Sequence, residues 1–373
     1  MFLKLHDILD NSNFFQSVPS KKNEKWRFSS LHTLLEREYK TVSLPAQEIP
    51  FTPQDRYWLY IKDGQLIEHT LPSNVHIRQH PLSYEVVNNP FACLASREAL
   101  SPLELMCYED VEFTLYFDYS QDCFINSNIN IILKDGVAAK VFMNYEGGEN
   151  SFITHLSHIQ LQPFTKLYLT QNQSLSSDAV FITQNSHHLQ ENSYLKSFSL
   201  LHGGEYLHNF LHADLHFNSE ADISSLLLSH DKQRQIFSCD IEHFSDRSKS
   251  QVLSKQVLRG NSTCVFDANT SIHAKTKLTE ARQASRALLL DDSAQIHSKP
   301  HLEIYSDDLK ASHGSTVGEL DIEAIGYLLS RGIPENRAKE ILISAFVNET
   351  IEKIEEAGFK DRIMAVLGES YEQ

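Results

Sequence analysis

The sequence predicts a mainly β protein: a central stack of short strands, preceded by a mixed helical and strand region and followed by helices. Three observations predict this class. Between residues 111 and 318, short apolar runs alternate with polar turns and no helical segment interrupts them. Residues 1–110 combine a loosely helical pattern with a hairpin signal, and residues 319–373 carry apolar residues at three- and four-residue steps. These three ranges are the expected domains.

Length and composition indicate a globular protein. The 373 residues suffice for a large core, and 41% hydrophobic with 22% charged residues excludes a disordered or membrane class. No aliphatic run approaches the roughly 18 residues of a spanning helix, and the first residues lack a signal-peptide pattern, so we expect a cytoplasmic protein without a membrane partner. The net charge of -16 argues against nucleic acid and favours protein partners.

The first region begins with a helical pattern around residues 23–35, where Leu31, Leu34 and Leu35 share one face. Prolines at 45, 50 and 53 then break the pattern. Asp63-Gly64 lies between two apolar runs and predicts a two-residue hairpin turn. We expect a short helix over residues 101–107 to close the region.

The central region contains strand-like runs, including residues 113–117, 130–133, 139–143, 166–170, 179–183, 194–200, 211–217 and 224–228. The absence of helices between them excludes a βαβ sheet and leaves a sandwich, a barrel or a β-solenoid. About 200 residues of strands are many for one sandwich, whereas a solenoid adds coils freely, so the pattern favours a β-helix. The glycine pairs at 147–148 and 203–204 are interpreted as turns.

The last region predicts three helices. Asp321 is the expected N-cap of a helix over residues 322–330, Gly332 ends it, and Pro334 lies in the first turn of the next. A third helix is expected over residues 360–367. The second helix carries the strongest apolar periodicity, on a face formed by Ala338, Ile341, Leu342, Ala345, Phe346, Ile351 and Ile354.

Common catalytic signatures are missing from the sequence. It has no phosphate-binding Gly-x-x-x-x-Gly-Lys motif, and the segment from Gly314 to Gly318 imitates a nucleophile elbow but places Thr316 at its centre. The five cysteines are widely spaced and contain no Cys-x-x-Cys pair, which argues against disulfides and against a self-contained metal site.

Histidine is abundant, with 19 copies. His202, His208, His212 and His216 occur in one segment, at spacings that allow a transition-metal site on a helix or strand. Their neighbours are mostly leucines rather than the carboxylates that usually orient metal-bound histidines, so we interpret them as solvated or packed side chains. The adjacent His187 and His188 are expected to point to opposite faces of a strand.

A signature follows at residues 280–318: Gln-x-x-Arg-x-Leu-Leu-Leu from Gln283, Lys-Pro-x-Leu-Glu-Ile-Tyr-x-Asp-Asp-x-Lys from Lys299, and Ser-His-Gly-x-Thr-x-Gly from Ser312. It resembles the SufB/SufD family of iron-sulfur cluster scaffold proteins, and the SufD branch in particular. The likeness is strongest over residues 251–346 and thin in the first hundred residues. It implies a right-handed parallel β-helix.

The resemblance also implies partners: a heterodimer with SufB and docking of the SufC ATPase on the C-terminal helices. The histidine matching His313 lies at the heterodimer interface in the family and is thought to help bind iron or the nascent cluster. Many SufD sequences carry a cysteine two residues earlier, where this chain has Ala311. No cofactor is expected on the isolated chain; an iron-sulfur cluster is expected transiently in the complex, where the family also allows reduced flavin.

The other motif residues are expected to be structural or to lie at the interface: Arg282, Gln283, Arg286, Glu303, Asp307, Asp308, Lys310, Gly314 and Thr316. Asp307 and Asp308 are expected to shape a turn. The expected ATPase-docking residues are Arg331, Gly332, Ala338, Leu342 and Phe346.

The sequence therefore predicts a non-catalytic scaffold subunit. Two alternatives stay open: a β-helix enzyme acting on metal or carbohydrate through the His202 to His216 segment or the two aspartates, and a homodimer that stores or carries clusters.

Overall fold

The computed structural model describes residues 2–4, 34, 37–42, 49–50, 52–79, 90–354 and 357–372. The helical pattern predicted around residues 23–35 lies almost wholly outside them. Before the central region the described elements are β1 (Phe2–Lys4), β2 (Glu38–Thr41), β3 (Trp58–Lys62), β4 (Gln65–Thr70), β5 (Val75–Gln79), α3 (Pro90–Glu98) and β6 (Leu103–Cys107).

The later elements are β7 (Val111–Tyr119), β8 (Cys123–Leu133), β9 (Ala138–Gly147), β10 (Phe152–Leu161), β11 (Lys166–Leu175), β12 (Val180–Leu189), β13 (Tyr194–Gly203), β14 (Tyr206–Leu215), β15 (Glu220–Ser229), β16 (Arg234–His243), β17 (Lys249–Leu258), β18 (Thr263–Ile272), β19 (Lys277–Leu289), β20 (Gln295–Ile304), β21 (Asp308–Glu319), α4 (Ile322–Ser330), α5 (Glu335–Ile351) and α6 (Ala357–Glu372).

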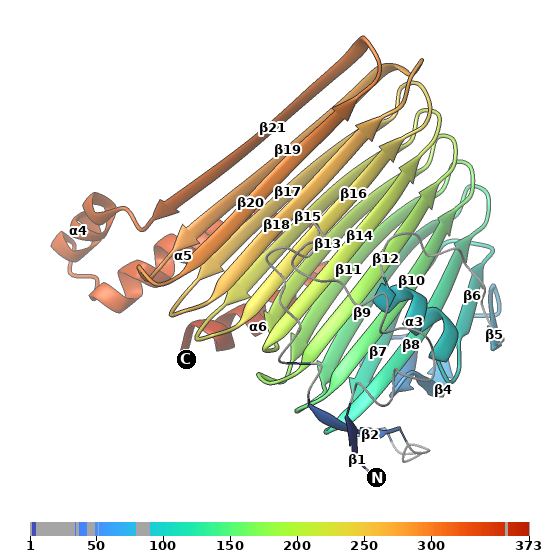
Figure 1. Ribbon diagram of the computed structural model, residues 1–373, viewed down its shortest axis with the longest axis horizontal. Helices are drawn as coiled ribbons and strands as arrows, with labels where there is room; N and C mark the ends of the chain where they lie inside the picture. Colours follow the sequence, from blue (N-terminus) through green and yellow to red (C-terminus); the bar gives the residue numbers. More distant parts are fainter. Residues whose placement is uncertain are drawn as a thin grey trace.

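From β7 onward the chain forms a parallel β-solenoid (Figure 1). Successive strands alternate between two sheets, and each strand pairs in parallel with the strand next but one along the chain. We call the sheet ending in β20 sheet A and the sheet ending in β21 sheet B. The fold class predicted from the alternation of strands and turns is confirmed.

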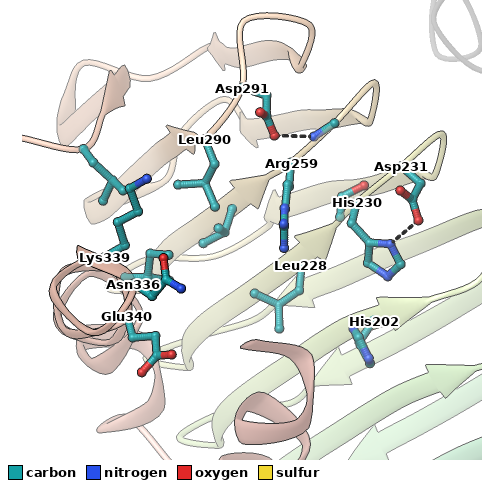
Figure 2. A pocket seen from close by; sticks show the side chains of 15 residues that line it. His202, Leu228, His230, Asp231, Arg259, Leu290, Asp291, Asn336, Lys339 and Glu340 are labelled. Carbon is teal, nitrogen blue, oxygen red and sulfur yellow. Dashed lines mark hydrogen bonds and ion pairs between the residues drawn. The ribbon is translucent and has the colours of Figure 1, made fainter. Parts of the chain in front are cut away.

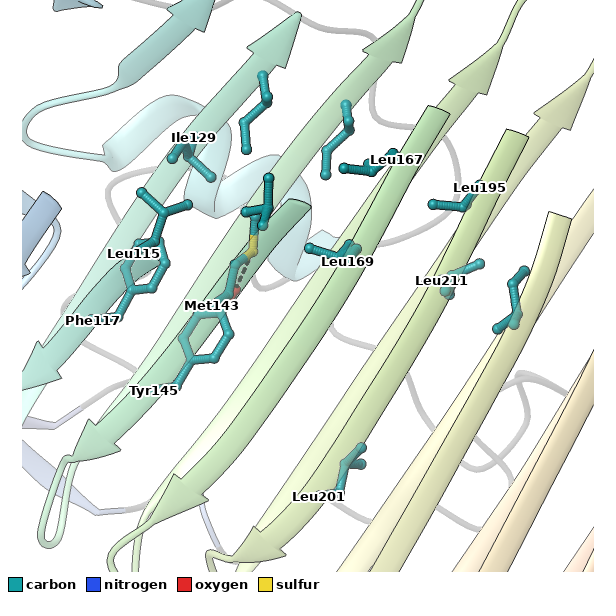
Figure 3. Packing of buried hydrophobic residues seen from close by; sticks show 14 of the residues in the cluster. Leu115, Phe117, Ile129, Met143, Tyr145, Leu167, Leu169, Leu195, Leu201 and Leu211 are labelled. Carbon is teal, nitrogen blue, oxygen red and sulfur yellow. Dashed lines mark hydrogen bonds between the residues drawn. The ribbon is translucent and has the colours of Figure 1, made fainter. Parts of the chain in front are cut away.

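The core lies between the two sheets, where the inward side chains of successive coils stack (Figure 3). Side chains alternate along each strand, so every second residue points inward. One inward row of sheet B is polar: Ser199, Ser225, Ser254, Ser285 and Ser315 occupy it in consecutive coils. The Oγ of Ser225 donates to that of Ser254 at 2.7 Å, so the row is hydrogen-bonded inside the core.

The turns predicted from glycine are confirmed. Asp63 and Gly64 have φ of 50° and 78° and connect the antiparallel strands β3 and β4. Gly203 ends β13 with a φ of 74°. An ideal Cβ on Gly203 would lie 2.0 Å from the carbonyl oxygen of Leu175, so only glycine fits between these two coils.

The helix predicted over residues 101–107 is wrong. Residues Leu103–Cys107 form β6, which pairs in parallel with β8 and is buried at all five positions. The segment is apolar enough to be buried as a helix or as a strand. It forms a strand because the edge of β8 offers backbone hydrogen-bond partners to it. The helix of this region is α3, which packs Phe91 and Leu94 against outward side chains of sheet A such as Phe152.

The C-terminal helices agree with the predicted start and stop signals. The Asp321 carboxylate accepts hydrogen bonds from the backbone N–H groups of Glu323 and Ala324, as expected of an N-cap, and Gly332 follows α4 with a φ of 82°. α6 is longer than the helix predicted over residues 360–367. No helix in the described ranges is long and apolar enough to cross a membrane.

The apolar face predicted for α5 is wrong in part. Ala338 and Ile351 are buried as expected, but Ile341 and Ala345 are exposed, and the buried face instead includes Ile343, Val347 and Thr350. This face packs on outward leucines of sheet B such as Leu200 and Leu226. The helix is therefore rotated relative to the orientation predicted from its periodicity, and Ile343, Val347 and Thr350 face the sheet instead of Ile341 and Ala345.

Ion pairs anchor the helices to sheet B. Lys255 is only 3% exposed, and its ammonium donates to the Phe346 carbonyl at 2.5 Å and pairs with Glu349 at 2.6 Å. Lys353 pairs with Asp222 at 2.7 Å, and Arg362 of α6 pairs with Asp55.

Candidate functional site

His313 lies on β21, the last strand of sheet B. β21 pairs with β19 in a register that places His313 beside Gln283. Neighbours in a parallel register share a face, so both point toward the inside of the solenoid. Gln283 is buried and donates hydrogen bonds to the Thr270 hydroxyl at 2.6 Å and the His301 carbonyl at 3.2 Å, whereas His313 is exposed. The imidazole therefore lies where the coil interior opens to solvent.

A shallow groove of about 320 Å³ adjoins His313. β17, β19, β21 and α5 line it, and its charged members are Arg282, Arg286 and Glu349. Arg286 donates to Glu349 at 2.6 Å. The hydrogen bond from Lys255 is the main cause that holds the pKa of Glu349 below its ordinary value, so the carboxylate is ionised at neutral pH. The helix α5 thus contributes one side chain to the groove of the last coil.

The structure brings together some of the predicted motif residues. Arg282, Gln283, Arg286, Gly314 and His313 all line the groove, and Thr316 pairs in register with Arg286. Arg282 and Arg286 alternate with Gln283 along β19, so their side chains lie on the outer face of sheet B, opposite to the face toward which Gln283 and His313 point.

Other motif residues lie away from the groove. Glu303 is near the end of β20, and Lys310 is near the start of β21. Asp307 lies between these two strands and Asp308 is the first residue of β21, so both are at the connection where a turn was expected.

His313 has no cysteine beside it. Ala311 occupies the position two residues earlier, next to Ala281. All five cysteines are at described positions and form no disulfide, and none is on β19, β20 or β21. Burial alone raises the pKa of Cys107 to about 12, which keeps that thiol protonated. Within the described ranges, no three His, Cys, Asp or Glu side chains form a group that could hold a metal ion.

The histidines of the 202–216 segment do not converge. His202 is on sheet B, His208 is buried and stacked on Phe210 with ring centroids 3.7 Å apart, and His216 lies in a turn. His212 instead shares Asp214 with His188: Asp214 lies 2.9 Å from His212 Nε2 and 2.6 Å from His188 Nδ1.

This corrects the expectation that these histidines have no carboxylate neighbour. Burial opposes ionisation of Asp214, but the hydrogen bonds from His188 and His212 outweigh it and hold its pKa below the ordinary value. His188 faces outward and His187 is fully buried, as their adjacency predicted. The pairing of β12 with β14 creates the contact, which sequence spacing did not indicate.

A second cleft, of about 790 Å³, lies between the ends of the sheet B strands and α5 (Figure 2). Leu228, Val257 and Ile343 form its apolar floor. Arg259 and Lys339 extend into it from opposite sides. Sequence reasoning missed this cleft because its lining residues come from six separate segments.

The predicted docking residues are partly covered. Ala338 is buried, Leu342 and Phe346 are half-buried, and the Arg331 guanidinium lies 5.3 Å from the centre of the Tyr327 ring. The exposed apolar surface is instead on α4, which has no buried residue. Its large exposed side chains are Ile322, Tyr327 and Leu329, and Ile341 of α5 is exposed as well.

Comparison with known families matches residues 117–346 to the family described as "SUF system FeS cluster assembly, SufBD core domain". Among curated proteins, the chain is 31% identical over 242 residues to "Iron-sulfur cluster assembly protein SufD" of Escherichia coli (strain K12), covering 60% of this chain and 56% of that protein. It is 28% identical over 146 residues to the protein of the same name from Bacillus subtilis (strain 168), covering 39% and 33%.

A third similar protein is "Protein ABCI7, chloroplastic" of Arabidopsis thaliana, at 32% identity over 141 residues and covering 37% of this chain and 26% of that protein. The chain thus spans from about a quarter to little more than half of these relatives' length. The residues matched to the family include His313, its groove partners on β19 and most of α5.

Proposed function

Because the chain belongs to the SufBD family of iron-sulfur cluster assembly proteins, we propose that it is a non-catalytic, cytoplasmic scaffold subunit that holds partners around a growing cluster. The observation that carries this proposal is the position of His313: an exposed imidazole on the inward face of an uncovered last coil. One imidazole supplies one ligand, so a cluster or iron ion at this place takes its remaining ligands from another subunit.

The first partner is SufB, paired across the open end of the solenoid. β20 and β21 are the last strands of their sheets in the described part of the chain, and β21 is exposed along nearly its whole length. Strand edges of this kind accept a further strand. A partner strand there would lie beside His313 and bring a thiolate that Ala311 does not supply.

The second partner is the SufC ATPase, docked on α4 and α5. An exposed apolar helix surface is the kind of surface that a partner protein covers. Because Phe346 and Ala338 also serve the packing of α5, the exposed side chains of α4 are the better probes of docking. Reduced flavin belongs to the proposal only as a ligand of the assembled complex, and no step here depends on it.

Substituting His313 tests the scaffold role. In the complex co-purified with SufB and SufC, His313→Ala is expected to lower iron and sulfide per complex at least about fivefold, because it removes one nitrogen ligand from a shared site. The subunit ratio on size-exclusion chromatography stays unchanged. The matched control is His301→Ala, since His301 is also exposed but lies on neighbouring β20. Equal iron content in the wild type and His313→Ala contradicts the assignment.

Substituting Leu329 tests the docking surface. Leu329→Asp is expected to weaken binding of the ATPase about tenfold or more, because it places a charge in an apolar contact. Isothermal titration of the two purified proteins measures the change, and the isolated chain is expected to hydrolyse no ATP. Phe164→Asp serves as the control, because Phe164 is also a large exposed apolar side chain but lies between β10 and β11, several coils away from α4. Unchanged binding of Leu329→Asp rejects α4 as the docking surface.

A further inference from the structure

The second cleft, between the ends of the sheet B strands and α5, has an apolar floor. Leu228 and Val257 are partners in register on β15 and β17, and Ile343 of α5 belongs to the same hydrophobic cluster. All three side chains border the cleft. Its volume of about 790 Å³ lies in the range of pockets that hold small organic molecules, which are mostly apolar with a few polar groups. The floor can therefore take the apolar body of a small ligand.

The Arg259 side chain extends over this floor (Figure 2). Arg259 is the first residue after β17, and its backbone N–H donates to the Ser229 carbonyl at 2.9 Å, which positions it at the edge of the cleft. Its side chain is exposed, and no carboxylate in the described part of the chain forms an ion pair with its guanidinium. The planar N–H donors of a guanidinium match carboxylate and phosphate oxygens. The cleft thus contains a cation that the protein itself does not neutralise.

The carboxylates that border the cleft already have partners. Asp231 pairs with His230 at 2.9 Å, Asp291 accepts the Gly260 N–H at 2.7 Å, and Glu340 accepts from Arg337 at 2.7 Å. Lys339 extends into the cleft opposite Arg259 and pairs with Glu335 at 2.7 Å, four residues earlier on the helix. Exposed pairs of this kind contribute little. The Lys339 ammonium can therefore exchange Glu335 for an anion in the cleft at small cost.

His202 borders one end of the floor. It is the partner in register of Leu228, so its ring continues the row of side chains that forms the floor. Burial, and then the neighbouring His230, lowers the pKa of His202 to about 4, so the imidazole is uncharged at pH 7. His202 therefore adds a flat, neutral surface to the floor, and the positive charge of the cleft comes from Arg259 and Lys339.

We propose that this cleft binds a small organic anion, whose apolar body lies on the floor and whose carboxylate, phosphate or sulfonate group lies between Arg259 and Lys339. The shape separates the two parts of such a ligand, because the apolar side chains form the base and the two cations approach from opposite sides. The proposal is independent of the proposed scaffold function, since it uses neither the His313 groove nor the exposed side chains of α4.

The test uses a fluorescent aromatic anion, anilinonaphthalene sulfonate, titrated into the full chain at pH 7. Arg259→Gln is expected to weaken its binding about fivefold or more, because the sulfonate loses a charged donor, and Lys339→Gln about threefold. Arg78→Gln is the matched control, since Arg78 is also exposed but lies on β5, beside the first coils. It should bind within about twofold of the wild type. Circular dichroism verifies that each variant is folded.

An uncharged dye with a similar aromatic body, phenylnaphthylamine, separates the two parts of the site. Its affinity is expected to be the same for the wild type and Arg259→Gln, because it carries no anion. Displacement of the sulfonate dye by octanoate or by a nucleoside monophosphate then tells a carboxylate ligand from a phosphate ligand. Inorganic phosphate should displace it poorly, because it has no apolar body.

Two results overturn the proposal. The first is dye binding that Arg259→Gln leaves unchanged, which would place the dye on apolar surface elsewhere, such as α4. The second is displacement by inorganic phosphate as effective as by the organic anions, which would remove the role of the apolar floor. Either result leaves the proposed scaffold function standing, because the iron content of the complex and its dependence on His313 do not involve this cleft.

Discussion

Replacing Gly203 by alanine is expected to lower the free energy of unfolding by about 3 kcal/mol, because both the backbone and the neighbouring coil reject a side chain there. The φ of 74° is unfavourable for any residue with a Cβ, and the added methyl group would meet the Leu175 carbonyl oxygen at 2.0 Å. Backbone of a packed coil cannot move aside as a flexible side chain would. Urea unfolding followed by circular dichroism measures the loss.

Gly136→Ala is the matched control. Gly136 has a φ of 77°, nearly that of Gly203, but an added Cβ would meet nothing within 4 Å. Its expected cost is therefore the backbone term alone, about 1 kcal/mol. If both variants lose the same stability, the contact between coils is not what requires glycine at position 203.

Removing the carboxylate of Glu349 is expected to destabilise the chain more than removing the ammonium of Lys255. Glu349→Gln removes the negative charge beside a buried cation and leaves it the Phe346 carbonyl and ring and a neutral amide oxygen as partners, at an expected cost of about 2 kcal/mol. Lys255→Met costs less, about 1 kcal/mol, because Glu349 is half-exposed and keeps Arg286. Urea unfolding of the two variants gives the order, and limited proteolysis after α5 shows whether the helices detach.

The same pair predicts a pH dependence. The pKa of Glu349 is lowered from 4.5 in the folded chain, so its contribution to stability is complete above about pH 4.5 and is lost as the pH falls through the folded pKa. The difference between wild type and Glu349→Gln should therefore shrink in acid. Glu335→Gln, which removes a fully exposed partner of Lys339, is expected to leave stability unchanged at every pH. A difference that grows in acid contradicts the assigned pair.

Local signals predicted the elements whose cause is local. Asp63-Gly64, the Asp321 cap and Gly332 act within a few residues, and the structure confirms each. Short apolar runs separated by polar turns predicted the strands, because each strand buries side chains inside its coil. Neither of these signals depends on the register between coils. The strand β6 was missed because its strand conformation depends on pairing with the edge of β8, which is distant in sequence.

The candidate site was less predictable for the same reason. His313 and its motif neighbours are close in sequence, so the signature located them. Glu349 reaches Arg286 across 63 residues, and Asp214 reaches His188 through the pairing of two coils. In the folded chain, Lys255 of β17 donates a hydrogen bond to the Phe346 carbonyl of α5. The periodicity of the helix sequence cannot predict this contact with a distant strand. Contacts between distant segments therefore determine which charged side chains lie next to one another.

The inward serine row of sheet B also helps to fix the register between successive coils. Ser225 and Ser254 satisfy each other, and Ser285 donates to Gln256 at 3.3 Å. Slipping one coil by two residues would set an aliphatic side chain such as Leu227 or Ile223 against a buried hydroxyl, which costs about 1–3 kcal/mol for each bond lost. Contacts between apolar side chains alone would tolerate such a slip. The buried hydroxyl groups therefore favour one register between coils over the others.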